Sequence, residues 1–129
     1  MHYLDTSALV KFVVDEGDSA AFRSWAVERE GRLISSDIAR TELLRAVRRV
    51  YPERMPLARQ VLESIELLRL DTADFETAGR LAPDELRSLD ALHLAAALTL
   101  EDELEAFVTY DERLARAARL NGIGVEAPH

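Results

Sequence analysis

The chain contains no cysteine, only one lysine and no hydrophobic run long enough to cross a membrane. The absence of cysteine excludes disulfide bonds and thiolate metal sites from all 129 residues. A membrane-spanning helix needs about 20 consecutive apolar residues, and no stretch of this sequence approaches that length. The N-terminus begins with a strand pattern and lacks the sections of a signal peptide, so we expect a cytoplasmic protein.

The net charge of −8 argues against a protein that coats nucleic acid through its overall charge. An acidic enzyme can still bind a polyanion through a local basic patch and bound metal ions. With 48% hydrophobic and 31% charged residues, the composition is typical of a globular protein. The length fits a single domain that covers residues 1–129.

Five short strand patterns alternate with helical patterns along the chain. The predicted strands cover 1–4, 32–35, 67–70, 106–109 and 124–127. The predicted helices cover 20–30, 37–50, a segment from about 57, a segment from 71 or 72 that ends before Pro83, 88–100 and 112–120. Ser36 and Ser88 are the expected N-caps of two of these helices. This alternation predicts an α/β fold with a parallel sheet covered by helices on both faces.

Four acidic residues lie where predicted strands end or predicted helices begin: Asp5, Glu42, Asp90 and Asp111. Asp5 directly follows the first strand, and Asp111 follows the apolar run 106–110. In an open α/β sheet, ligands bind beside the carboxyl ends of the strands. We therefore expect the four carboxylates to meet in one pocket. An acid in the first turn of a helix also serves the helix dipole, which explains Asp90 equally well.

A site built only from carboxylates suits hard ions such as Mg²⁺ or Mn²⁺, which keep several waters and share substrate phosphate oxygens. Two such ions about 3.5–4 Å apart can activate water and stabilise the leaving oxygen of a phosphodiester displacement. The histidines His2, His93 and His129 have no zinc-like spacing. The acids therefore predict metal-dependent phosphodiester hydrolysis without a protein nucleophile.

Several other residues lie close to the acids in the sequence. The hydroxyls of Thr6, Ser7 and Thr109 are candidates to orient a carboxylate or a water, although small polar residues also simply finish strands. His93 follows Asp90 by three residues on an otherwise apolar helix. We interpret it as a hydrogen-bonded core residue in preference to a group that reaches the site.

Four arginines are the candidate phosphate contacts of an otherwise acidic chain. Arg45 and Arg49 follow Glu42 by three and seven residues, and therefore share its helical face. Arg40 and Arg48 lie on the same predicted helix. A solvated basic face that pairs with neighbouring acids explains these arginines equally well.

Three segments resemble the PIN-domain ribonucleases, especially the VapC-type toxins of bacterial toxin–antitoxin pairs. They are LDTSALVK at 4–11, LDALHLAAA at 89–97 and VTYDERL at 108–114. They occur in the order and spacing of that family, with Glu42 between them, and the resemblance spans the whole chain. Each motif alone is weak, whereas the three motifs in register are specific.

The resemblance implies a three-layer PIN-like fold and an endoribonuclease that depends on Mg²⁺ or Mn²⁺ and cleaves RNA with a metal-activated water. The acids of the family match Asp5, Glu42, Asp90 and Asp111, and none is missing. The resemblance further implies an RNA substrate, a small VapB-like antitoxin encoded beside the toxin, and a homodimer. The four arginines would then contact RNA.

Two other families with an acidic pocket on an α/β fold match the sequence poorly. A haloacid-dehalogenase-like phosphatase needs a second acid where this chain has Ser7, and a response-regulator receiver needs a lysine after its last strand, whereas the only lysine is Lys11. Two alternatives stay open. One is a PIN-fold nuclease of RNA processing that has no antitoxin, and the other is a noncatalytic RNA- or protein-binding module.

Overall fold

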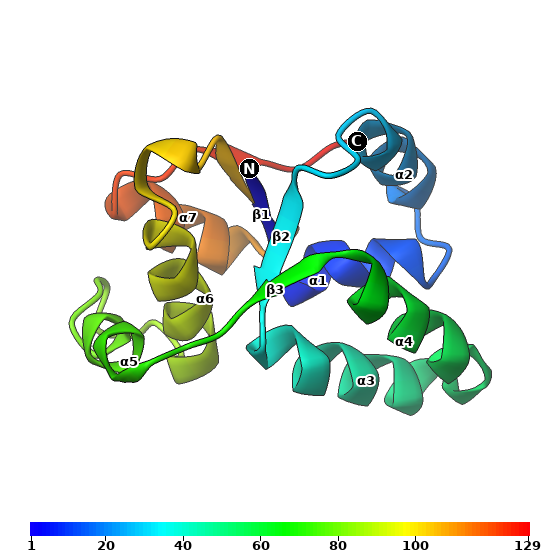
Figure 1. Cartoon of the computed structure of the whole chain (residues 1–129), viewed down its shortest axis with the longest axis horizontal. Helices are drawn as coiled ribbons and strands as arrows, with labels where there is room; N and C mark the ends of the chain where they lie inside the picture. The colour runs from blue at the N-terminus through cyan, green and yellow to red at the C-terminus, as the bar shows by residue number, and fades with distance from the viewer.

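A computed structural model describes residues 1–129 and shows one five-stranded sheet with helices on both faces (Figure 1). The strand order is β3-β2-β1-β4-β5, and every neighbouring pair is parallel. The strands are β1 (His2–Leu4), β2 (Leu33–Ser36), β3 (Glu66–Leu68), β4 (Ala106–Val108) and β5 (Val125–Glu126).

The helices form two groups on opposite sides of the sheet (Figure 1). The first group comprises α1 (Thr6–Leu9), α2 (Ser19–Val27), α3 (Ile38–Val50) and α4 (Met55–Ser64). The second group comprises α5 (Thr72–Ala78), α6 (Ser88–Leu98) and α7 (Glu112–Leu120). Three short 3₁₀ helices complete the chain, at η1 (Val10–Phe12), η2 (Pro52–Arg54) and η3 (Glu101–Glu103). None of these helices is both long and apolar enough to span a membrane.

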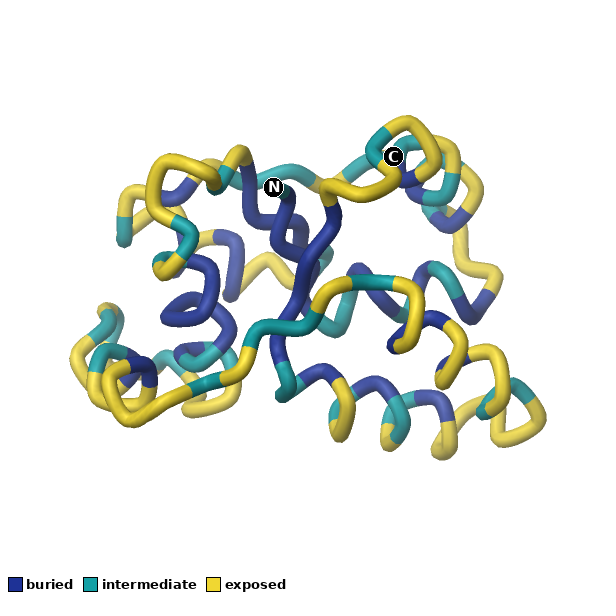
Figure 2. The backbone as a smooth tube through the Cα atoms, viewed as in Figure 1, coloured by how far each residue is buried: buried dark blue, intermediate teal, exposed yellow.

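Successive strand residues face opposite sides of the sheet and form two separate cores. Tyr3 of β1 lies in register with Ile34 of β2 and with Phe107 of β4, and all three pack against α6 and α7. Leu4 and Val108, the next residues of β1 and β4, pack against α1 to α4. The three central strands are accordingly buried along their length, as Figure 2 shows.

The carboxyl ends of all five strands lie at one edge of the sheet because the strands are parallel. β1 is the middle strand, so Asp5, the residue that follows it, lies at the centre of that edge. α3 and α6 begin close to the same edge after β2 and before β4. This arrangement brings segments that are about 40 to 105 residues apart in sequence to one place on the surface.

The sequence predicts the number and direction of the strands correctly, whereas several boundaries differ. The turn expected after the first strand is helical, as α1 and η1. α2 begins one residue earlier than predicted and ends at Val27, α4 begins at Met55, and β3 is displaced toward the N-terminus. Asp71 caps α5 through a capping box with Asp74, as expected.

The two predicted serine N-caps are wrong. Ser36 is the last residue of β2 and pairs with Leu68, so its backbone is still extended where the cap was expected. The N-cap of α3 is Asp37, without a side-chain capping bond. Ser88 is the first residue of α6, and the extended residue before it is Arg87. Leu89 lies in the first turn of α6 and is 50% exposed.

Candidate active site at the carboxyl edge of the sheet

Asp5 is the most deeply buried of the four acids, at 3% exposure. Its Oδ1 accepts hydrogen bonds from the Ser7 hydroxyl (2.6 Å) and from the Ala8 backbone N–H (2.9 Å), which caps α1. Its Oδ2 accepts from the Thr109 hydroxyl (2.5 Å). Burial raises the pKa of Asp5 and outweighs the lowering effects of these bonds and of His93. The fold thus holds this carboxylate in one orientation.

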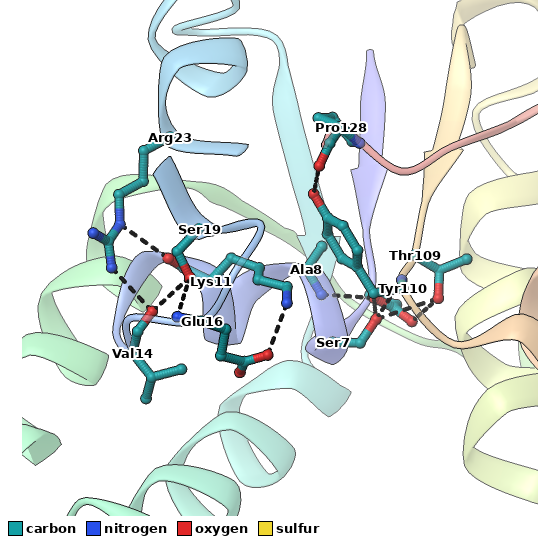
Figure 3. Close-up of polar contacts among 11 residues, drawn as sticks. Ser7, Ala8, Lys11, Val14, Glu16, Ser19, Arg23, Thr109, Tyr110 and Pro128 are labelled. Atoms are coloured by element: carbon teal, nitrogen blue, oxygen red, sulfur yellow. Dashed lines mark hydrogen bonds and ion pairs between the residues drawn. The ribbon is translucent and has the colours of Figure 1, made fainter. Parts of the chain in front are cut away.

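Ser7 and Tyr110 connect the end of β4 to α1 (Figure 3). The Tyr110 backbone N–H donates to Ser7 Oγ (2.9 Å), and the Tyr110 hydroxyl donates to the Pro128 carbonyl (2.5 Å). The Lys11 ammonium lies 4.5 Å from the centre of the Tyr110 ring and pairs with Glu16 at 2.7 Å. The only lysine of the chain is therefore buried and paired beside the site.

Glu42 lies on α3 and turns one carboxylate oxygen toward the protein. Its Oε1 accepts from the Thr6 hydroxyl (2.7 Å) and contacts His93 Nε2 (2.5 Å), while Oε2 has no hydrogen-bond partner. Burial works against the charged form of Glu42. The bond to His93, the charge of His93 and the Thr6 hydroxyl outweigh burial, so the pKa of Glu42 lies below its ordinary value.

His93 on α6 is 1% exposed, so the prediction of a hydrogen-bonded core residue is confirmed. One of its partners is the site residue Glu42, a contact that was not predicted from the sequence. Its other ring nitrogen, Nδ1, lies 2.7 Å from the Tyr3 hydroxyl. The sequence feature that indicates this contact is the position of His93 one helical turn after Asp90, which places it below the carboxyl edge of the sheet.

Asp90 and Asp111 line one open cleft. Asp111 is exposed and caps α7, because its Oδ1 accepts from the backbone N–H groups of Arg113 (2.9 Å) and Leu114 (3.2 Å). Asp90 lies in the first turn of α6 and is half-buried. Burial raises the pKa of Asp90, and repulsion from Asp111, Glu42 and Asp5 adds to that rise against the attraction of His93.

The other three acids therefore lie close enough to Asp90 to influence its ionisation, and no hydrogen bond from the protein stabilises the Asp90 carboxylate. The side chains do not form a closed ligand set: nowhere in the chain do three acidic or histidine side chains converge as protein ligands for an ion. Thr6, Ser7 and Thr109 each bond to one of these carboxylates, as their position in the sequence suggested.

A groove beside Glu42 is lined by three arginines of α3. Arg45, Arg48 and Arg49 share this groove with Glu42 and Leu89, and none of the three arginines forms an ion pair within the chain. Their spacing of three and four residues places them on one helical face. The groove thus combines three free guanidinium groups with one site carboxylate.

Arg40 behaves differently from the other predicted arginines. It pairs with Asp37 at 3.1 Å and does not line the groove. Arg113 and Arg116 of α7, which were not predicted as site residues, line the cleft of Asp90 and Asp111. Arg113 and Arg116 are three residues apart on α7, a spacing that indicates a shared helical face.

Comparison with known proteins gives a consistent assignment. The PIN domain family matches residues 2–120. Ribonuclease VapC46 of Mycobacterium tuberculosis is 42% identical over 126 residues, which cover 98% of this chain and 96% of the relative. Ribonuclease VapC35 of the same species is 43% identical over 131 residues, which cover 99% and 97%.

The fold also matches a solved structure. The crystal structure of Mycobacterium tuberculosis VapC20, described as a Sarcin-Ricin loop cleaving toxin, superposes with a TM-score of 0.75. The match covers 91% of this chain and 95% of that chain at 13% sequence identity, so it supports the fold alone. The family match and the two relatives of high identity show that the chain belongs to the PIN-domain family, in its VapC-type group.

Proposed function

We propose that this protein is an endoribonuclease dependent on Mg²⁺ or Mn²⁺ and the toxin of a toxin–antitoxin pair. The observation that carries the proposal is the placement of Asp5, Glu42, Asp90 and Asp111 around the carboxyl edge of a PIN-type sheet. The names of the relatives VapC46 and VapC35 support RNA as the substrate.

The donor atoms of the four acids fit a hard divalent ion. Asp90 accepts no protein hydrogen bond, and Glu42 Oε2 and Asp111 Oδ2 have no protein partner. All of these donors are carboxylate oxygens. Since no three side chains converge as ligands, the set suits an ion that keeps several waters and completes its shell with substrate phosphate oxygens. Asp5, Glu42, Asp90 and Asp111 would hold such an ion.

When bound, the ion supplies an activated water and stabilises charge on the leaving oxygen. The chain itself contributes position and charge. Ser7 and Thr109 fix both oxygens of Asp5, and Thr6 fixes one oxygen of Glu42. Asp90 and Asp111 contribute negative charge from the neighbouring cleft. No side chain acts as a nucleophile in this mechanism, because the cleavage needs only water and placed charge.

The test of this activity is a cleavage assay on purified protein with a labelled RNA. Mg²⁺ or Mn²⁺ should support cleavage, EDTA should abolish it, and Asp5→Asn should be inactive while it stays folded. Asp102→Asn removes one exposed acid from η3 and serves as the charge-matched control. Equal cleavage in EDTA would contradict the metal mechanism, and folded wild-type protein without any cleavage would favour a noncatalytic binding module.

The arginine groove is the proposed path for the RNA backbone. Phosphate contacts dominate the affinity of proteins for nucleic acid and make it depend on salt. Loss of Arg45 and Arg48 in a double glutamine variant should weaken binding of RNA to the noncleaving Asp5→Asn protein and flatten its salt dependence by about one unit for each lost contact. Arg40→Gln is the control, because Arg40 is already paired with Asp37. Equal loss in the control would place the RNA elsewhere.

The proposed partners are a small VapB-like antitoxin and a second copy of this chain. Coexpression with the product of the adjacent gene should yield a stable complex and relieve growth arrest. A neighbouring protein that neither binds nor relieves arrest would favour a PIN nuclease of RNA processing. Analytical ultracentrifugation of the free toxin should show a dimer, and a monomer at all concentrations would contradict that part.

A further inference from the structure

A buried chain of polar side chains runs from the sheet to Glu42. The Tyr3 hydroxyl donates to Ser36 Oγ (2.8 Å) and lies 2.7 Å from His93 Nδ1. On its other side, His93 Nε2 lies 2.5 Å from Glu42 Oε1. Tyr3 and Ser36 are fully buried, and His93 is 1% exposed. The chain therefore connects β2, β1 and α6 to the candidate site on α3.

The inner end of this chain has no freedom to move. The Tyr3 ring stacks on Phe107 with 5.3 Å between ring centres and 8° between ring planes. Its hydroxyl is fixed by Ser36. A histidine ring with a partner at each nitrogen cannot rotate without breaking one of the two bonds. An ionised carboxylate only accepts hydrogen bonds, so Nε2–H is the donor to Glu42.

We propose that His93 is a positioning residue for Glu42. Both protein contacts of the Glu42 carboxylate, from His93 and from Thr6, fall on Oε1. They fix the carboxylate in one rotamer and leave Oε2 without a protein partner, so that this oxygen is available to the ion or one of its waters. An unrestrained glutamate would lose side-chain entropy on being ordered. The fold has already ordered this one.

This inference rests on the proposed function in one respect, namely that Glu42 is a ligand of the proposed metal ion. Partners that orient a metal ligand through its outer shell typically contribute about 10–100-fold to metal affinity or activity. His93 itself is too buried to touch RNA. Its loss should therefore lower kcat and metal affinity and leave the KM for RNA unchanged, a pattern that general loss of packing does not produce.

The experiment compares His93→Leu, His93→Gln and Tyr3→Phe with the wild type. Mn²⁺ binding is measured by titration calorimetry and cleavage by kcat and KM. His93→Leu should weaken Mn²⁺ binding by about 10–100-fold, and Tyr3→Phe should weaken it less. His93→Gln should restore most of the affinity because its amide N–H replaces Nε2–H. Leu94→Ala is the control, since it opens the core on the same helix without touching the polar chain.

Crystal structures of the wild type and His93→Leu make the result independent of activity. The Glu42 carboxylate should keep its rotamer in the wild type and be displaced or disordered in the variant. Unchanged Mn²⁺ affinity in His93→Leu, an equal loss in Leu94→Ala, or an undisplaced Glu42 would each overturn the proposal. A wild type that cleaves no RNA would overturn the proposed function instead, and the position of Glu42 would still decide the role of His93.

Discussion

Asp5 and Asp90 belong to the same candidate site, yet the structure holds them in opposite ways. Asp5 follows the central strand, is 3% exposed and accepts three hydrogen bonds. Asp90 lies in the first turn of α6, is half-buried and accepts none. The difference shows that one side of the site is organised by the fold itself, whereas the other side stays free for a ligand to organise.

The pKa values of both carboxyls are raised, but the interactions that act beside burial differ between the two residues. Burial raises the pKa of Asp5, and three hydrogen bonds act against that rise. Burial raises the pKa of Asp90 as well, and repulsion from Asp111, Glu42 and Asp5 adds to it. Removal of Asp5 therefore removes interactions that the fold uses. Removal of Asp90 relieves repulsion, so the two acids should differ in their effects on stability.

The largest expected effect is on catalysis, in which the two acids should behave alike. Asp5→Asn and Asp90→Asn should both lower kcat by at least about a hundredfold, because loss of metal-held charge costs several kcal/mol of transition-state stabilisation. Single-turnover cleavage of a labelled RNA in Mn²⁺ measures the loss, and circular dichroism checks that each variant is folded. Retained activity in either variant would remove that acid from the proposed catalytic set.

A second prediction sharpens the comparison through the hydrogen bonds. Asp5→Ala should have a free energy of unfolding about 2 kcal/mol below that of Asp5→Asn, as urea denaturation can measure. Alanine loses the cap of α1 and leaves the Ser7 and Thr109 hydroxyls without their acceptor. At position 90 the alanine and asparagine variants should have equal stability, since Asp90 accepts no hydrogen bond. A gap of similar size at both positions would show that Asp90 is also a structural cap.

A third prediction extends the contrast to Glu42, whose pKa is lowered. A carboxyl whose pKa is lower in the folded state stabilises the protein at pH values above its unfolded-state pKa. That contribution to stability is lost as pH falls through the folded-state pKa. At pH 7 and without metal, Glu42→Gln should therefore melt about 2–4 °C below wild type, for a loss of roughly 1 kcal/mol. The gap should close below about pH 4. A gap that stays constant between pH 7 and 4 would mean that the charge of Glu42 is not what stabilises the fold.

The parts of this site that the sequence predicts are those set by chain order and strand direction. Asp5 and Asp111 follow buried strands, and parallel strands bring their carboxyl ends together, so the location of the site follows from alternating strand and helix patterns. The capping of α7 by Asp111 is also a local feature of the chain, but it was not predicted. The serine caps failed because Ser36 takes part in β2 pairing, which depends on where β3 lies and not on local sequence.

The contacts between side chains could not be predicted from the sequence for a related reason. Whether His93 meets Glu42 depends on how α3 and α6 pack against the sheet, and the two residues are 51 positions apart. The arginines of α3 show the same limit. Four of them look alike in sequence, but Arg40 is paired with Asp37 and only the other three line the groove. Such choices depend on rotamers and neighbours that no periodicity encodes.

The smallest expected effect is a gain. In the absence of metal, Asp90→Asn should melt slightly above wild type at pH 7, by roughly 1–2 °C, because it removes a crowded charge. Ions that bind only the folded site stabilise it by mass action, so the gain that Mg²⁺ gives to the wild type should shrink in the variant. Asp102→Asn, which removes an exposed acid of η3, is the control and should not show either change.

The pH dependence of that gain in melting temperature shows whether ionised Asp90 destabilises or stabilises the protein. A raised folded-state pKa means that ionised Asp90 destabilises the protein, and this penalty appears as pH rises through the unfolded value near 4. It is full above the folded-state pKa. The metal-free wild type should therefore gain stability relative to Asp90→Asn as pH falls from 7 toward 5, as differential scanning fluorimetry can measure. If Asp90→Asn melts below wild type throughout that range, Asp90 stabilises the N-terminus of α6 through the helix dipole, and repulsion among the acids is not what governs this position.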